Sequence, residues 1–493
     1  MLDIALYLLG ILIIVIGLAV SIGLHEVGHL LPAKLFGVKV TQYMIGFGKT
    51  LWSRRRGETE YGVKAIPLGG YVAMIGMYPP QKPGEAARAS TTGFLNTVVQ
   101  ESPASRRAET EADVLTEIER IGDPSDAHAS NTEDADRPEP RRRGIAGMVE
   151  EARLASAESI GEGDEGRTFY QLPVWKKIVI MLGGPVMNLL LAGVFFAIVL
   201  VGFGIPQYTT TLGSVSECLI PASSTQTTCE PGDPAAPAAA AGLRPGDRIV
   251  AIDGEAVTEW EQIRDRVSAA PGTTLPVTVD RDGQELTVQL TPAANERWAL
   301  DARGNVVTDA EGEPVIETVG MIGVSPTSAI VQQPLTAVPS FVGENVVAVA
   351  QIILGLPQRM VDVWNAAFGT EERDPNGPIS VVGVGRLAGE VVSMEEVPVA
   401  ARAQTMFGLL GSLNVALFVF NLVPLMPLDG GHIAGALYEG AKRGLARLFR
   451  RPDPGPVDTA RMVPVTFAVV VVLGAMSVLL IYADLVKPIS LFG

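Results

Sequence analysis

The chain has 493 residues, of which 47% are hydrophobic and 19% are charged, and its formal net charge is −16. Its mean hydropathy of +0.28 suits neither an ordinary soluble enzyme nor a chain buried wholly in the bilayer. We therefore expect membrane helices joined to water-soluble parts. The acidic balance argues against a nucleic-acid-binding protein, because such proteins are normally basic.

The first predicted element is an apolar helix over residues 4–24 that continues to about residue 36. A membrane-spanning helix needs about 20 apolar residues, so this run is long enough. Its N-terminal position also fits a signal peptide. No basic segment precedes it, however, and no small-residue cleavage site precedes His25, so we expect a retained anchor.

The sequence His25-Glu26-Val27-Gly28-His29 lies at the end of this apolar run. Two histidines four residues apart share one helix face and can bind one Zn²⁺, with Glu26 beside them to move protons. The same five letters also occur in soluble helices as a pair of surface histidines. Ionisable residues in a membrane segment are costly, however, and usually have a metal, a partner or a task. The pattern therefore predicts a zinc site with Glu26 as general base.

One residue leaves the local geometry of this helix open. Pro32 lies three residues after His29. It cannot donate the helical hydrogen bond to the carbonyl of Gly28, so we expect a kink below the metal site.

A β-hairpin is predicted over residues 37–78, with strand-like stretches at 38–47 and 60–77 around a basic turn. An unpaired strand edge near the zinc could hold an unwound substrate by strand addition. The alternative is a small structural hairpin. The following residues, 79–172, contain few large apolar side chains and predict a flexible cytoplasmic insertion.

Three further segments, at residues 177–203, 403–425 and 464–486, are also long and apolar enough to span a membrane. Basic clusters follow the first span, precede the second, and separate the third from the fourth. These clusters comprise Lys34, Lys39, Lys49 and Arg54, Arg55 and Arg56, then Lys176 and Lys177, and then Lys442, Arg443, Arg447, Arg450 and Arg451. All three clusters are cytoplasmic if the N-terminus lies outside, which places the metal motif near the cytoplasmic end of span 1.

The region between spans 2 and 3 is then extracytoplasmic. Residues 211–325 alternate short strands and turns, and contain the two cysteines of the chain, Cys218 and Cys229. An oxidising compartment would allow a disulfide between them, and two free thiols are the alternative. Residues 340–368 predict an amphipathic interfacial helix rather than a fifth span, because polar residues interrupt the stretch.

The third metal ligand must come from elsewhere in the chain. Asp429 and His432, at the end of span 3, are rivals, because both side chains ligate zinc. Asn421 and Asn188 place amides at membrane depth. These amides either join helices by hydrogen bonds or bind the exposed backbone of a substrate, and we predict substrate binding for both.

Together these motifs resemble the site-2 protease family of intramembrane zinc metalloproteases. The resemblance is to the bacterial branch that regulates sigma factors and carries an extracytoplasmic PDZ domain. The matching residues are His25, Glu26 and His29; Gly46, Phe47 and Gly48, followed by 62–71; Gly183, Gly184, Pro185 and Asn188; 377–380; and Leu428, Asp429 and Gly430, while 242–254 resembles a PDZ turn and strand.

The resemblance implies that Asp429 is the third ligand and that His432 is a neighbour. It also implies that residues 37–78 form a membrane-re-entrant β-hairpin, in which Gly46, Phe47 and Gly48 help to hold the substrate. The PDZ domain would either bind a peptide or act as a size filter.

We therefore predict a polytopic α-helical membrane protein with four spans, a re-entrant β-hairpin and one extracytoplasmic PDZ-like α+β domain. The predicted segments are span 1 with the zinc motif (1–36), the hairpin (37–78), the insertion (79–172), span 2 (173–204), the PDZ-like domain (211–325), an extracytoplasmic amphipathic helix and loop (326–400), span 3 with the third ligand (401–437), a basic cytoplasmic loop (438–462) and span 4 (463–487).

The predicted activity is that of a zinc endopeptidase with one Zn²⁺ per chain in the bacterial inner (plasma) membrane. Its expected partners are the lipid bilayer, a single-span membrane protein as substrate (an anti-sigma factor already shortened by another protease) and a peptide ligand of the PDZ-like domain. No nucleic-acid partner is expected. A non-catalytic PDZ-bearing adaptor is the first alternative, but it predicts a decayed metal set. A zinc transporter is the second, but it needs metal ligands at several depths.

Overall fold

The structure is a computed structural model that describes residues 2–489, except 79–87, 92–162 and short gaps at 221–223, 225, 227, 231–232, 234, 300–305, 310–312, 371, 375–376 and 458–461. The chain divides into two compact units. The membrane unit comprises Met1–Val199 and Pro334–Gly493, and the sheet unit comprises Leu200–Gln333.

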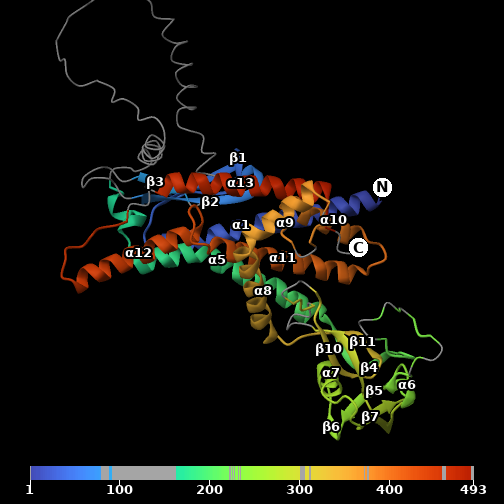
Figure 1. The fold of residues 1–493 in the computed structure, drawn as a ribbon. Coiled ribbons are helices and arrows are strands. Elements are labelled where there is room, and N and C mark those ends of the chain that lie inside the picture. The colour runs from blue at the N-terminus through green and yellow to red at the C-terminus, as the bar shows by residue number, and fades with distance from the viewer. Residues whose placement is uncertain are drawn as a thin grey trace, which may run out of the picture. The chain divides into compact units, whose positions relative to one another are not determined.

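Long apolar helices form the body of the membrane unit (Figure 1). Among the described residues, five helices are long and apolar enough to cross a membrane. They are α1 (Leu2–Leu35), α5 (Val174–Ala197, continued by a π-helix at Ile198–Phe203), α8 (Ala337–Leu354), α11 (Val399–Asn421) and α13 (Val463–Val486). The chain is thus a multi-pass membrane protein, whereas the predicted number of four spans stays a prediction. The first helix runs through Pro32 without ending there.

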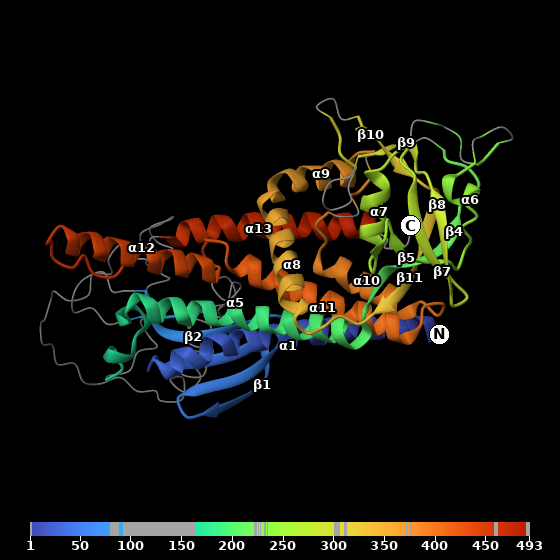
Figure 2. The same ribbon diagram turned by 90° about the horizontal axis from the view of Figure 1, so that it is seen from below.

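The stretch predicted as one amphipathic helix, 340–368, is two helices in the structure. The break falls at Gly355, between α8 and α9 (Leu356–Phe368), where Pro357 suits the first turn of a new helix. Helix α8 crosses the direction of α5 and α11 in both views (Figure 2). Its Phe341 ring lies 5.0 Å from that of Phe196 on α5.

A third helix of this region was not predicted. Helix α10 (Val381–Ser393) begins at Ser380, whose hydroxyl accepts a hydrogen bond from the backbone N–H of Gly383. It packs so closely on α1 that a Cβ added at Gly10 would lie 2.3 Å from the carbonyl oxygen of Ala388. In the described part of residues 326–400, predicted as one helix and a loop, the structure therefore has the end of β11, the helices α8, α9 and α10, and the first residues of α11.

The third predicted span, 401–437, is interrupted. Helix α11 ends at Asn421, and α12 (Asp429–Leu448) begins only after a non-helical segment. Pro424 and Pro427 lie in that segment and cannot donate backbone hydrogen bonds, which explains the break. The predicted basic loop at 438–462 accordingly contains the second half of α12, and Asp429 opens a helix rather than ending one.

The predicted hairpin is a curled sheet made of β1 (Val40–Arg56), β2 (Thr59–Tyr78) and β3 (Arg88–Thr91), in the order β1-β2-β3. Residues 42–45 are paired twice, with 70–73 and with 60–63. This happens because β1 bends at Gly46 and Gly48, whose φ angles of +90° and +80° are accessible mainly to glycine. The first half of β1 is therefore not a free edge.

Parts of the predicted flexible insertion, 79–172, belong to this fold. Strand β3 pairs with β2, and Phe169 packs in an apolar core with Leu30 and Ile180. Arg167 forms two hydrogen bonds with Glu58, at 2.7 and 2.8 Å, which hold the pKa of that carboxyl below its usual value. The central residues of the insertion, 92–162, lie outside the described part of the chain.

The sheet unit is an α+β domain. Its strands are β4 (Ile205–Val215), β5 (Arg248–Ile252), β6 (Glu255–Ala256), β7 (Leu275–Arg281), β8 (Gln284–Leu290), β9 (Ala293–Trp298), β10 (Ile316–Met321) and β11 (Val324–Val331), and its helices are α6 (Pro237–Ala240) and α7 (Trp260–Ser268). The main sheet has the order β11-β4-β5-β7-β8, with β6 on β5, and β9 and β10 form a second sheet. The unit extends beyond the predicted limits of 211–325 at both ends.

Two local features of the sheet unit follow from its sequence. Asp282 and Gly283 have φ angles of +54° and +82° between the antiparallel strands β7 and β8, as a two-residue hairpin turn requires. Cys218 and Cys229 are joined by a disulfide, with their Cα atoms 5.9 Å apart.

Candidate metal centre

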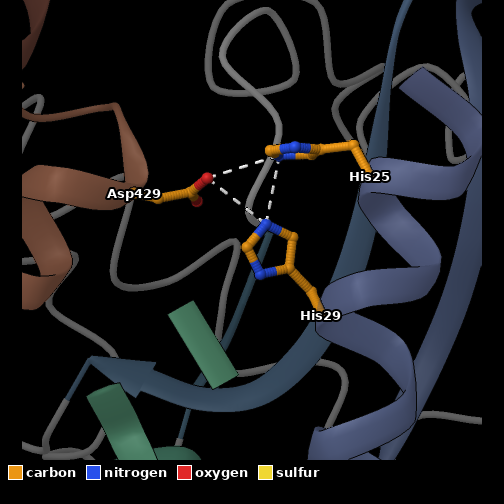
Figure 3. Close-up of side chains that lie close together, drawn as sticks. All are labelled: His25, His29 and Asp429. Atoms are coloured by element: carbon orange, nitrogen blue, oxygen red, sulfur yellow. Dashed lines mark hydrogen bonds and ion pairs between the residues drawn. The ribbon is translucent and has the colours of Figure 1, made fainter. Parts of the chain in front are cut away.

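Three side chains from two helices converge inside the membrane unit. His25 and His29 project from α1 toward Asp429, the first residue of α12 (Figure 3). Oδ2 of Asp429 lies 3.3 Å from Nε2 of each histidine, and the two Nε2 atoms lie 3.2 Å apart. All three side chains are buried. This is the only such group of possible metal ligands in the described ranges.

The other ring nitrogen of each histidine is held by α5. Nδ1 of His29 lies 2.8 Å from the carbonyl oxygen of Ile180, and Nδ1 of His25 lies 3.0 Å from the amide nitrogen Nδ2 of Asn188. Both imidazoles are therefore oriented from behind, with Nε2 facing the centre of the group. The contact of His29 with a backbone carbonyl is one that metal-binding histidines commonly make.

Two glycines let α5 approach the ligands closely. A Cβ added at Gly184 would lie 2.2 Å from Nε2 of His29 and 2.7 Å from Nε2 of His25. A Cβ at Gly183 would lie 1.9 Å from the carbonyl oxygen of Gly28. That carbonyl is the one whose helical hydrogen bond Pro32 cannot supply. The sequence at 183–185 thus serves the contact between α5 and α1 at the metal site.

The donor set fits Zn²⁺. Two imidazole nitrogens and one carboxylate oxygen are the ligand types of catalytic zinc sites, which leave the fourth position for water or substrate. Oδ2 of Asp429 is buried, and its close contacts in the described structure are the two Nε2 atoms, to which it makes no well-aligned hydrogen bond; a metal between the three atoms would satisfy it. His432 lies outside the group and lines a cavity of about 30 Å³ with Lys177 and Glu439.

Comparison with known proteins agrees with this geometry. Residues 13–449 match peptidase family M50. This chain belongs to that family. Family M50 contains the site-2 proteases, so the predicted membership of that family is confirmed, and the chain is a zinc metalloendopeptidase. The sigma-factor-regulating branch and the PDZ domain stay predictions. The presence of the full ligand set counts against the non-catalytic adaptor.

The relatives extend over almost the whole chain. Zinc metalloprotease Rip1 of Mycobacterium tuberculosis is 28% identical over 494 residues, covering 99% of this chain and 100% of the relative. Metalloprotease MmpA of Caulobacter vibrioides is 28% identical over 468 residues, covering 90% and 91%. Zinc metalloprotease RasP of Geobacillus kaustophilus is 26% identical over 422 residues, covering 83% and 84%.

Glu26, the predicted general base of this M50 peptidase, lies on α1 next to His25 and is 5% exposed. Strand β2 packs directly on it, because a Cβ added at Gly70 would lie 2.9 Å from Cγ of Glu26. The curled sheet therefore borders the metal centre on the side of Glu26.

The predicted substrate-binding residues lie in different surroundings. Phe47 is buried, with its ring over Gly69, and Gly46 and Gly48 form the bend in β1 described above. Asn421, the last residue of α11, is partly exposed, and its amide bonds to no residue that the structure describes. Asn188 is fully buried beside His25. A role in substrate binding stays a prediction for all of them.

Some polar residues of the interior were missed by the sequence analysis. Asn414 on α11 is fully buried and donates a hydrogen bond of 2.9 Å to Ser21 on α1. Ser21 lies four residues before His25 and hence on the same face of α1. The spacing of Ser21 and His25 was the sequence signal that Ser21 is buried, but it did not identify Asn414 as its partner.

Proposed function

We propose that this protein is an intramembrane endopeptidase that hydrolyses a peptide bond in or near the transmembrane segment of a single-span membrane protein. The observation that carries the proposal is the position of the metal group. Two of its ligands belong to α1, an apolar helix long enough to cross a membrane, and the third comes from a helix that faces them.

Each residue of the metal centre has a separate role in hydrolysis. Zn²⁺, when bound by His25, His29 and Asp429, polarises the substrate carbonyl and lowers the pKa of a water molecule to about 7. The carboxylate of Glu26 takes a proton from the attacking water and delivers it to the nitrogen of the leaving amine. Burial of the group keeps other water out of the reaction.

The substrate must be unwound before it is cut, because a membrane helix uses its peptide groups in internal hydrogen bonds. We assign Asn421 to this step. It lies eight positions before Asp429 in the sequence, and its side-chain amide is partly exposed and can form hydrogen bonds with the substrate backbone. Strand addition to the curled sheet, near Gly46, Phe47 and Gly48, would hold the unwound segment. Residues 42–45 cannot serve as the pairing edge, because both of their sides are already paired.

The remaining proposals concern location and substrate class. The basic clusters favour an N-terminus and sheet unit outside the cytoplasm of a bacterial cell, with the zinc near the cytoplasmic end of α1. The sheet unit would act as a PDZ-like domain that binds a peptide or excludes substrates with large ectodomains. An anti-sigma factor already cut once fits such a filter, and its cleavage would release a cytoplasmic fragment.

The test is a Glu26→Gln variant of the full chain in lipid nanodiscs with a candidate single-span substrate. We expect unchanged zinc content and cleavage slower by about 10²–10⁴-fold, the usual effect of losing a general base. Glu344→Gln, at an exposed position on α8, is the matched control and should cleave normally. Normal cleavage by Glu26→Gln would remove Glu26 from the mechanism. Cleavage only of soluble peptides by the wild type would refute the intramembrane assignment.

A further inference from the structure

We propose that Asn188 is a positioning residue for the metal: its side-chain oxygen accepts a hydrogen bond from Nδ1–H of His25 and thereby aims Nε2 of His25 at the zinc. The proposal rests on the zinc centre and is independent of which substrate the enzyme cuts. It assigns Asn188 a different partner from the substrate backbone predicted for it from the sequence.

The neighbouring histidine shows what such an interaction requires. The carbonyl oxygen of Ile180, 2.8 Å from Nδ1 of His29, can only accept a hydrogen bond. Nδ1 of His29 must therefore carry the proton, which leaves the lone pair of Nε2 free to bind a metal. A histidine that binds zinc through Nε2 needs an acceptor at Nδ1 in this way.

His25 has the same need, and Asn188 is the group in place to meet it. The side-chain nitrogen of Asn188, Nδ2, lies 3.0 Å from Nδ1 of His25. An asparagine amide offers a nitrogen at one end and an oxygen at the other, and a half-turn about the Cβ–Cγ bond exchanges them. The oxygen of Asn188 is buried and has no other partner among the described residues. Turning it toward Nδ1–H satisfies both groups.

The arrangement makes α5 the common support of both imidazoles. Ile180 and Asn188 lie eight residues apart on α5 and contact His29 and His25, which lie four residues apart on α1. Gly184, midway between them, brings α5 close enough for both contacts. Asn188 is fully buried in this packing. A simple helix-to-helix role remains the alternative, and the bond between Asn414 and Ser21 provides an example of it.

The experiment measures zinc affinity by competition with a chelator, and the visible absorption spectrum of the Co²⁺-substituted enzyme, for full-length variants in nanodiscs. We expect Asn188→Ala to bind zinc about 10–100-fold more weakly and to change the Co²⁺ spectrum. Asn188→Asp should retain affinity and spectrum, because a carboxylate oxygen also accepts from Nδ1–H. Asn414→Ala, the matched buried amide, should leave both unchanged.

Each other outcome overturns the proposal. Unchanged zinc affinity in Asn188→Ala with a raised KM would assign Asn188 to the substrate. Unchanged affinity with lowered thermal stability, shared by Asn414→Ala, would reduce it to a structural amide. If Asn188→Ala does not fold, the test rests on Asn188→Asp. A loss of zinc affinity of about 10–100-fold in Asn188→Asp would show that His25 does not require an oxygen acceptor at this position.

Discussion

The two units of the molecule differ in where their large apolar side chains lie. In the sheet unit, apolar residues such as Ile249, Ile252 and Val277 form the core. In the membrane unit, many large apolar side chains point outward, and none of the most apolar window of α13 is buried. Its interior contains apolar clusters, such as that of Leu30 and Ile180, together with buried ion pairs, Lys177 with Glu439 and Arg373 with Asp484.

This difference reflects the different forces that hold each unit together. Water drives the apolar residues of the sheet unit together. Lipid is as apolar as leucine, so helices in a bilayer gain little from hiding apolar surface and associate through close packing and hydrogen bonds. Substitutions should therefore act through clashes and broken polar pairs in the membrane unit, and through loss of ordinary folding stability in the sheet unit.

The largest expected effect tests close packing at the metal. Gly184→Ala would place a methyl group 2.2 Å from Nε2 of His29, so α5 must move away from both imidazoles. Displacement by about 1 Å at a catalytic centre can cost about 100-fold in rate, and we expect at least this loss together with weaker zinc binding. Gly193→Ala, on the same helix with open space around it, should have neither effect. Equal activities of the two variants would contradict the packing argument.

The next effect tests the buried polar pairs. Nζ of Lys177 lies 2.9 Å from both carboxylate oxygens of Glu439, and both side chains are buried. Among the described residues, Lys177→Met leaves this carboxylate with Arg443 as its one charged partner and the backbone N–H of Val457 as a weak donor. We expect unfolding to become easier by about 3 kcal/mol. The double variant Lys177→Met with Glu439→Leu should recover most of that loss. Thermal unfolding of the full chain measures both, and a double variant as unstable as the single one would show that the charge is not the cause.

A smaller effect is expected in the sheet unit. The disulfide between Cys218 and Cys229 closes a loop with a sequence separation of 11. A loop of this length contributes roughly 2–3 kcal/mol, mainly by restricting the unfolded chain. Replacing both cysteines by serine should speed hydrogen exchange in residues 205–331 and leave zinc affinity unchanged. Altered zinc affinity in this variant would mean that the two units do not respond separately.

The smallest effect concerns pH. Arg281 donates two hydrogen bonds of 2.7 Å to the buried carboxylate of Asp247, which holds the pKa of Asp247 below its ordinary value. Stability from this pair is complete above the unfolded-state pKa of about 3.9 and is lost as the pH falls below it toward the folded-state pKa. Protection factors for hydrogen exchange in the sheet unit, which correct for the slower intrinsic exchange at low pH, should fall between pH 5 and pH 3. Asp247→Asn should reduce that dependence, and an unchanged profile would exclude Asp247 as its source.

The sequence predicts the local parts of the metal centre well. The spacing of His25 and His29 is a property of a single helix, so α1 had to bring them together. The length of the apolar runs likewise predicts α5, α11 and α13. Asp429 is different, because its distance from α1 depends on how α11 ends and α12 begins. The residues alone left it equal to His432, and the resemblance to a known family favoured it.

The features that the sequence did not predict depend on contacts between distant segments. The contact of Asn188 with His25, and the close approach of both imidazoles to Gly184, exist only after α5 has packed on α1. The bend at Gly46 and Gly48 turned an expected hairpin edge into a paired strand, because two positive φ angles redirect the chain. The break at Gly355, which divided one expected helix into two, is the exception, because Gly355 and Pro357 are local signals for it. The other cases depend on geometry that no periodicity of the local sequence expresses.

The wide separation of the ligands in the sequence also has a consequence for biosynthesis. Asp429 comes 400 positions after His29. A ribosome that adds about 5–20 residues per second needs on the order of 20–80 s to cover that distance. During this interval the nascent chain presents two histidines to the membrane without the carboxylate that completes the set. A chain that ends before residue 429 thus lacks the third ligand, and the metal centre can be completed only after most of the protein has been made.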